Sequence, residues 1–85
     1  MKQPLETTID HEVGAAYVAY APIGPGDVAR TERVNHDVHA DFDSSGALLG
    51  IEVLALDDAA LSVACDYAAK IGVAFPDQLS GARST

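Results

Sequence analysis

The spacing of hydrophobic and polar residues changes once along the chain, near Asp57. Before this point apolar residues recur with a period of about two, which is typical of strands, and after it with a period of about 3.6, which is typical of a helix. The pattern therefore predicts an α+β domain. We expect an antiparallel meander of four or five short strands over residues 5–54, covered on one face by a helix over residues 58–71.

The predicted strands are short and are separated by residues that form turns. They cover residues 5–9, 15–21, 28–34, 38–42 and 47–54. Both faces of the second segment are largely apolar, with Tyr17 and Tyr20 on opposite faces, which suits a central strand. The third segment is mostly polar, so we expect it at an edge of the sheet.

Two registers are open for the hairpin around residues 43–46. A three-residue loop pairs Phe42 with Leu48, whereas a loop one residue longer pairs Phe42 with Ala47. We favour the longer loop because it keeps the charged side chains of the first strand away from the aliphatic face of the second. A bulge at Gly50 would reconcile the two registers.

The predicted helix has a signal at each end. Asp57 or Asp58 can accept hydrogen bonds from the first free amides, and Gly72 can end the helix in the left-handed conformation. The expected buried stripe consists of Leu61, Ala64, Cys65, Ala68 and Ile71. Val73 and Phe75 are expected to fold back onto the core, and residues 77–85 to form a frayed end.

Composition indicates one small domain, residues 1–85, with a thin core. Of the 85 residues 48% are hydrophobic, but 15 of them are alanine and none is tryptophan. An alanine-rich helix and one sheet face leave apolar area uncovered, so we expect a homodimer that uses the second strand and either the helix stripe or residues 73–75.

The net charge narrows the range of partners. Five basic residues against 13 acidic residues give a formal charge of −8. Binding of nucleic acid through its phosphates needs clustered lysine and arginine, so that class of function is excluded. The net negative charge of the chain instead favours a basic protein as partner.

The compartment is predicted from what the chain lacks. Its single cysteine, Cys65, cannot close an internal disulfide, and residues 1–6 lack the apolar stretch of a signal peptide. The longest uncharged run, residues 13–26, is shorter than the roughly 20 residues of a membrane span. We therefore expect a soluble cytoplasmic protein.

Three stretches resemble a known family. Residues 9–18, residues 29–34 and above all the motif D-x-D-x-x-G-x-L-x-G-I-E-x-L over residues 41–54 are similar to the DUF2283 family, small bacterial proteins of unknown function. The resemblance covers residues 5 to 56 and implies a shared fold without a mechanism. Because some relatives are thought to be encoded near small toxin-like proteins, it also implies a toxin-like protein as partner.

One polar cluster invites a chemical interpretation as a metal site. Its candidate ligands are His36, His39, Asp41 and Asp43. On a strand, however, His36 and His39 point to opposite faces, and the others are spaced by roughly 6.7 Å along the strand. We therefore favour the solvated side of a half-buried strand, with no cofactor, and keep a small metal-binding protein or enzyme as the alternative.

The favoured function is a non-catalytic interaction module. The candidate residues for binding a basic partner are Glu32, Asp37, Asp41, Asp43 and Glu52. Cys65 lies on the apolar stripe, so we expect its side chain to act as a small hydrophobic group and not as a nucleophile.

Gly50 and Glu52 carry the most specific prediction. A glycine inside an apolar run indicates a bulge or a close backbone approach that a side chain would block. Glu52 is expected either to reach Arg30 or Arg33, or to bind a partner, or to be an ordinary solvated charge, which is the interpretation we favour.

Overall fold

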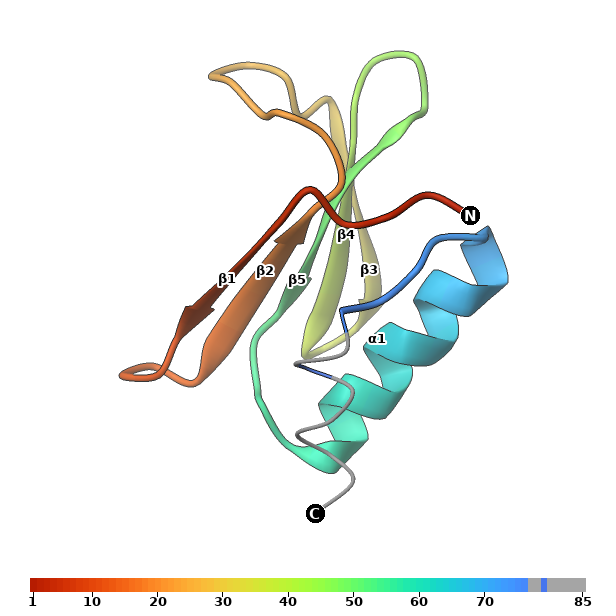
Figure 1. Ribbon diagram of the computed structural model, residues 1–85. Coiled ribbons are helices and arrows are strands. Elements are labelled where there is room, and N and C mark those ends of the chain that lie inside the picture. Colours follow the sequence, from red (N-terminus) through yellow and green to blue (C-terminus); the bar gives the residue numbers. More distant parts are fainter. Residues whose placement is uncertain (77–78, 80–85) are drawn as a thin grey trace.

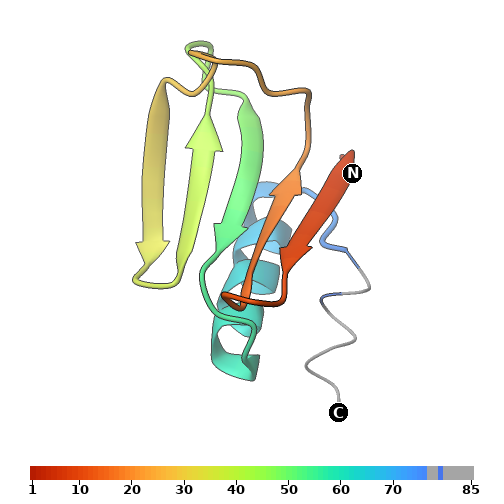
Figure 2. The ribbon, with the colours of Figure 1, turned by 90° about the vertical axis from the view of Figure 1, so that its left-hand side faces the viewer.

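Five antiparallel strands and one helix form the described part of the chain, residues 1–76 and 79 of a computed structural model (Figure 1). The helix lies against one face of the sheet and leaves the other face uncovered (Figure 2). The predicted α+β class is confirmed. The elements are β1 (Glu6–Asp10), β2 (Ala15–Ala19), β3 (Arg30–Asn35), β4 (Val38–Phe42), β5 (Leu48–Val53) and α1 (Asp58–Ile71).

The strand order is β1-β2-β5-β4-β3, which differs from a simple meander in one place. The β1–β2 hairpin and the β3-β4-β5 meander are each sequential, but residues 20–29 carry the chain from β2 across to the far edge. The most apolar strand, β5, thereby takes the centre, between β2 and β4. The mostly exposed β3 lies at an edge, as its polar pattern predicts.

The β4–β5 hairpin combines both predicted registers. At the turn, the amide of Asp43 donates to the carbonyl of Ala47 (2.9 Å) and Phe42 pairs with Leu48, so the preferred longer loop is wrong. One step further the register shifts, and Asp41 pairs with Gly50. This irregularity beside Gly50 is the reconciling bulge, and it returns the apolar residues of β4 and β5 to the same face.

The helix begins and ends where its caps predict. The Asp57 carboxylate accepts from the amide of Ala60 (2.8 Å), and Gly72 ends the helix with φ 82°. The buried line runs through Ala60, Leu61, Ala64 and Ala68. The predicted stripe is therefore wrong at two positions: Cys65 lies at the margin of this line, and Ile71, the last helical residue, is 38% exposed.

The core lies between α1 and the inner sides of the strands. Three alanines of the helix are at most 1% exposed, and their small side chains bring α1 close to the sheet. From the sheet come the buried side chains of β2, β4 and β5, namely Ala16, Val18, Val38, Ala40, Phe42, Leu48, Ile51 and Val53.

The segment after the helix folds back, as expected for Val73 and Phe75. Val73 is buried and bridges to Lys2, and Phe75 packs on the core. The amide of Ala74 donates to the Lys2 carbonyl (2.8 Å), while the Tyr20 hydroxyl donates to the Ala74 carbonyl (2.7 Å). The predicted frayed end, residues 77–85, lies outside the described residues except for Leu79, which is buried in the core.

Candidate functional site

The uncovered side of the sheet, here called the open face, carries the most polar side chains that the fold brings together. Strand alternation places on it every second residue of the strands whose other residues enter the core. Cross-strand pairing arranges them in two rows. The first row is Thr8, Tyr17, Glu52, His39 and Arg33, and the second is Glu6, Ala19, Gly50, Asp41 and Thr31.

Asp41, on β4 next to the edge strand β3, is held by two hydroxyl groups. The Tyr17 hydroxyl donates to Oδ2 of Asp41 (2.8 Å), and the Thr31 hydroxyl donates to Oδ1 (2.7 Å). These contacts join β2, β4 and β3 across the sheet. Within residues 1–76 and 79 the structure gives Asp41 no ion pair, so its half-buried charge is held by neutral donors alone.

Gly50 makes this arrangement possible. The Tyr17 ring reaches Asp41 by crossing β5 directly over Gly50, and a Cβ atom at residue 50 would collide with the ring and hydroxyl of Tyr17. The predicted close approach at Gly50 is therefore confirmed, in addition to the neighbouring bulge.

Tyr17 stays protonated well into the alkaline range. Burial, the hydrogen bond to Asp41 and the negative charges of Asp41 and Glu52 all raise the pKa of Tyr17 above its ordinary value. The hydroxyl therefore acts as a donor that orients the Asp41 carboxylate, and not as a base.

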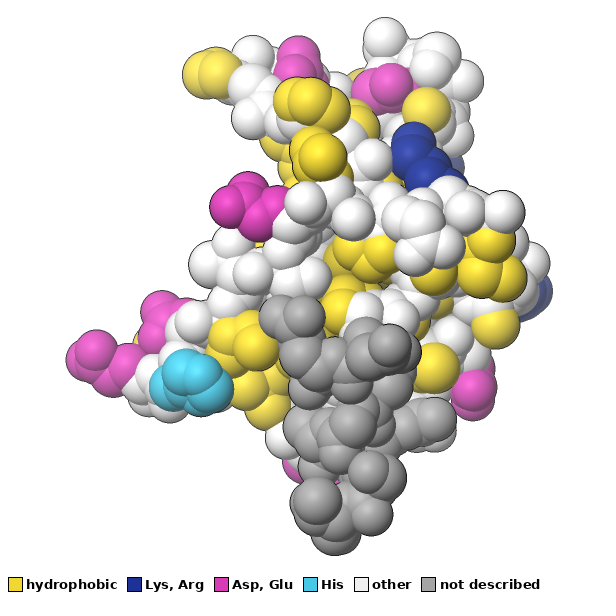
Figure 3. Space-filling view, viewed as in Figure 1, with side chains coloured by type: hydrophobic (Ala, Val, Ile, Leu, Met, Phe, Trp, Pro, Cys, Tyr) yellow, Lys and Arg dark blue, Asp and Glu magenta, His cyan; other side chains and the backbone are white. Residues whose placement is uncertain are grey.

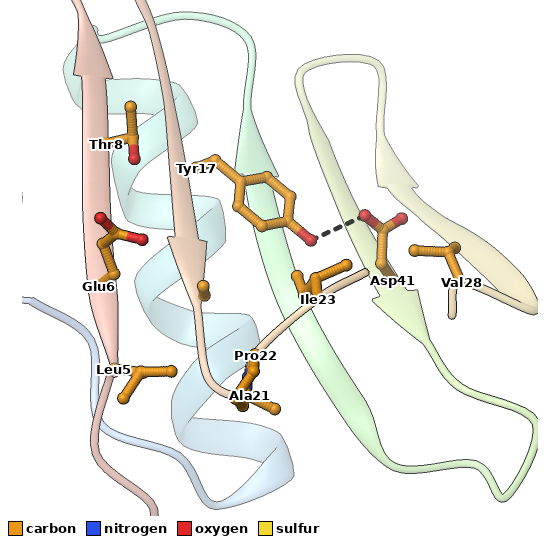
Figure 4. A pocket seen from close by; sticks show the side chains of 10 residues that line it. Leu5, Glu6, Thr8, Tyr17, Ala21, Pro22, Ile23, Val28 and Asp41 are labelled. Atoms are coloured by element: carbon orange, nitrogen blue, oxygen red, sulfur yellow. Dashed lines mark hydrogen bonds between the residues drawn. The ribbon is translucent and has the colours of Figure 1, made fainter. Parts of the chain in front are cut away.

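A hollow of about 450 Å³ lies beside Tyr17 on the open face (Figure 4). Glu6 and Thr8 stand on one side of it and the Tyr17–Asp41 pair on the other. One end of the hollow is closed by Leu5 and by residues 21–23 and 28 of the loop that leads to β3. Ala19 also contributes to the lining. A smaller hollow of about 170 Å³ lies on the other side of Tyr17, beside Ala15 and Glu52.

The open face is predominantly acidic. Asp10 continues the line of Glu6 and Thr8 along β1, so this face bears four carboxylates against one arginine and one histidine among the described residues. In Figure 3 acidic side chains gather along the left-hand side, where the open face is seen in profile. The potential over this face therefore favours cations.

Glu52 has a different neighbour from the two predicted. Its Oε1 atom lies 3.6 Å from Nδ1 of His39, across the β4–β5 pair. Arg30 instead lies over the ring of Phe42 at 4.3 Å, on the helix side of the sheet. The alternative in which Glu52 reaches Arg30 or Arg33 is thus wrong, because β5 is separated from β3 by β4, and the partly exposed Glu52 side chain contacts His39 instead.

The four candidate metal ligands are not brought together. His36 lies at the β3–β4 turn beside Asp37 (3.1 Å), and His39 contacts Glu52. Asp43, at the opposite end of β4, uses Oδ1 to cap the hairpin turn through Ser45 and Ala47. Within the described chain, no three residues of metal-ligating type converge.

The motif over residues 41–52 also fits the spacing of a helix–loop–helix calcium site. Its structural context is different, because the flanking segments are the strands β4 and β5. Asp41 points onto the open face toward Tyr17, while Asp43 bonds within the turn. The spacing therefore reflects a strand pairing and a capped hairpin.

The candidate partner-binding residues divide between the two sides of the sheet. Asp41 and Glu52 lie on the open face, and Asp37 lies at the turn that begins β4. Glu32 faces the helix side, where it accepts a hydrogen bond from the Tyr67 hydroxyl (2.8 Å). One continuous binding surface can therefore include Asp41 and Glu52 but not Glu32.

The sequence reasoning missed the roles of Tyr17 and Thr31. Neither residue type is chemically distinctive by itself, and the bonds to Asp41 join residues 10 and 24 positions apart. The available signal was Gly50, because a glycine between two apolar residues indicates that something crosses it. What crosses it depends on the pairing of β2 with β5.

No helix in the described residues is long and apolar enough to span a bilayer. Comparison with known proteins found no match among curated proteins and none among solved structures. The family of proteins of unknown function DUF2283 matches residues 7–56, from β1 to the segment just before α1. The match thus includes Gly50 and the three residues joined by hydrogen bonds on the open face, Tyr17, Asp41 and Thr31. Because the match covers more than half of the chain, the protein belongs to the DUF2283 family.

Proposed function

We propose that this protein is a non-catalytic interaction module whose open face binds a basic segment of another protein, such as a toxin-like protein. The observation that carries the proposal is the four carboxylates that the described residues of this uncovered sheet face present against a single arginine. The formal charge of −8 extends the same preference over the whole molecule. Such a surface speeds the encounter with cationic partners and repels acidic ones.

Exposed aliphatic side chains supply the apolar contact that a charged patch lacks. Leu5, Ile23 and Val28 are 61%, 39% and 40% exposed and stand around the larger hollow. Val13, at 70%, stands beside the smaller one. Carboxylates flanked by exposed aliphatic side chains suit a segment in which basic and apolar residues alternate.

A synthetic peptide of lysine, leucine and serine tests the proposal. Its counterpart with glutamate in place of lysine serves as the control for charge. We expect the basic peptide to shift the backbone amide signals of the open face in NMR spectra, and the effect to weaken as salt is added. The acidic peptide should leave the spectrum unchanged.

Paired charge variants locate the binding. Glu6→Gln with Glu52→Gln removes two charges from the open face, whereas Asp58→Asn with Asp66→Asn removes two from α1. The first pair should weaken binding several times more than the second. Equal effects from the two pairs, or shifts confined to the helix, would contradict the proposal.

Homodimer formation remains a separate proposal. The surfaces predicted for it are largely used within one chain, since the helix stripe and Val73 are buried against the sheet and Phe75 packs on the core. Two copies meeting through the open face would oppose like charges. Light scattering at micromolar concentration tests it: twice the monomer mass of 8.8 kDa supports the dimer, and the monomer mass contradicts it.

A further inference from the structure

We propose that the hollow beside Tyr17 receives one lysine or arginine side chain of the binding partner. This inference rests on the proposed function and deepens it by assigning the recognised group to one place on the open face. Three properties of the hollow support it, namely its walls, its charge and its size.

The walls suit the methylene stem of a long basic side chain. Leu5, Ile23 and Val28 present exposed aliphatic groups around the hollow, and Ala19 keeps the space free because its side chain is a single methyl group. Lysine and arginine commonly lay their stems along apolar surface while the charged end reaches a polar group. An acidic side chain has too short a stem to use these walls.

The charge favours a cationic end group. Asp41 is oriented by Tyr17 and Thr31, both of which are neutral donors, so its negative charge is not balanced by either. A carboxylate has about four acceptor positions, and two hydroxyl donors leave room for a cation. Glu6 stands on the opposite side, and the Tyr17 ring offers an aromatic face to the same cation (Figure 4).

The size is sufficient for a long basic side chain. The space of about 450 Å³ lies near the lower end of the range of small-molecule pockets, roughly 300–1,000 Å³. The hollow is also not an enclosed cavity, so a side chain can enter while its backbone stays above the sheet.

Short peptides test this directly. We would titrate the protein with capped Gly-Lys-Gly, Gly-Arg-Gly and Gly-norleucine-Gly and follow the amide signals of Ala19, Ile23 and Asp41 by NMR. The two basic peptides should shift these signals at millimolar concentration. Norleucine, which has the stem without the charge, should bind about tenfold more weakly. Equal binding of norleucine would overturn the proposal, because the hollow would then select only for apolar contact.

Matched variants identify the hollow. Ala19→Leu fills it, whereas Ala15→Leu makes the same change on the same strand beside the smaller hollow. Asp41→Asn keeps the shape and removes the charge, so it answers the question even if Ala19→Leu fails to fold. We expect Ala19→Leu and Asp41→Asn each to weaken binding about tenfold, and Ala15→Leu to leave it unchanged. A loss with Ala15→Leu as large as with Ala19→Leu would overturn the assignment.

The longer basic peptide separates this inference from the proposed function. If that peptide still binds the open face of Ala19→Leu and Asp41→Asn at full strength, the hollow is not the site although the open face is. If neither the short nor the long peptides bind, both proposals fail. Signals of Ala19 and Ile23 that change on dilution of the protein alone would show a second copy in the hollow, which also overturns the proposal.

Discussion

The two faces of the sheet come from the same strands, yet they are held together by different forces. Along β4, Val38, Ala40 and Phe42 enter the core while His39 and Asp41 face solvent. On the covered face, the side chains that β2, β4 and β5 contribute are apolar and almost fully removed from water. The open face is instead organised by hydrogen bonds around one carboxylate.

This difference separates stability from recognition. Burial of apolar area is non-directional and large in total, so the covered face holds the fold together. Hydrogen bonds between half-buried groups contribute little net free energy but set positions within a few tenths of an ångström. The open face is therefore where this small domain can present a defined arrangement of charges without endangering its fold.

The largest expected effect comes from the covered face. Leu61→Ala removes a side chain that is 1% exposed and leaves a cavity against the sheet, so it should lower the free energy of unfolding by about 2–5 kcal/mol. Leu54→Ala, at a site 42% exposed, is the matched control and should cost less than about 1 kcal/mol. Chemical denaturation compares them, and equal costs would show that α1 is not packed as described.

Gly50→Ala tests the open face at its tightest point. The added methyl group pushes the Tyr17 ring away from Asp41, so we expect a loss of about 1–3 kcal/mol in the free energy of unfolding. In a Tyr17→Ala background the obstacle is gone. There the same change should be neutral or slightly stabilising, because alanine costs less backbone entropy than glycine. A cost of equal size in both backgrounds would mean that Tyr17 is not what excludes a side chain.

The covered face also makes the stability depend on pH, through Tyr20, the residue that follows β2. Burial, followed by the nearby charge of Cys65, raises the pKa of Tyr20 to about 12. The folded state therefore keeps a proton that the unfolded state loses above about pH 10, so this stability is complete below pH 10 and is lost as the pH rises toward 12. We expect the free energy of unfolding to fall by about 1 kcal/mol between pH 10 and 11 from Tyr20 alone.

Tyr20→Phe is the control for that titration. It removes the ionisable group together with the bond to the Ala74 carbonyl. The variant should be less stable near neutral pH but should lose less stability on going to pH 11, as followed by denaturation at each pH. An unchanged slope would show that folding does not raise the pKa of Tyr20.

The smallest effect is expected for Glu52→Gln. The contact with His39 spans 3.6 Å and both side chains are partly exposed, so the variant should change the free energy of unfolding by less than about 1 kcal/mol. Thermal unfolding near neutral pH measures this. A loss of several kcal/mol would mean that Glu52 is part of the stabilising structure of the open face, and the contrast between the two faces would then be weaker.

Local features of the chain were enough to predict most of the fold. Alternation along residues 38–42 and the apolar stripe through Leu61, Ala64 and Ala68 depend on periods that each segment carries by itself. The caps Asp57 and Gly72 act within one helical turn. These elements were therefore predictable from the sequence.

The tertiary structure decided how these elements meet. The strand order depends on β2 pairing with β5, more than 30 residues along the chain. The β4–β5 register depends on where the pairing shifts, which Gly50 allows but does not by itself determine. The candidate site follows from those pairings, since they bring Tyr17 over Gly50 and against Asp41. By itself the sequence determined which residues alternate, where the helix begins and ends, and that the surface is acidic, because neighbours along the chain set these properties. Only the folded sheet decided which carboxylate is held by which hydroxyl, because that depends on contacts between distant segments.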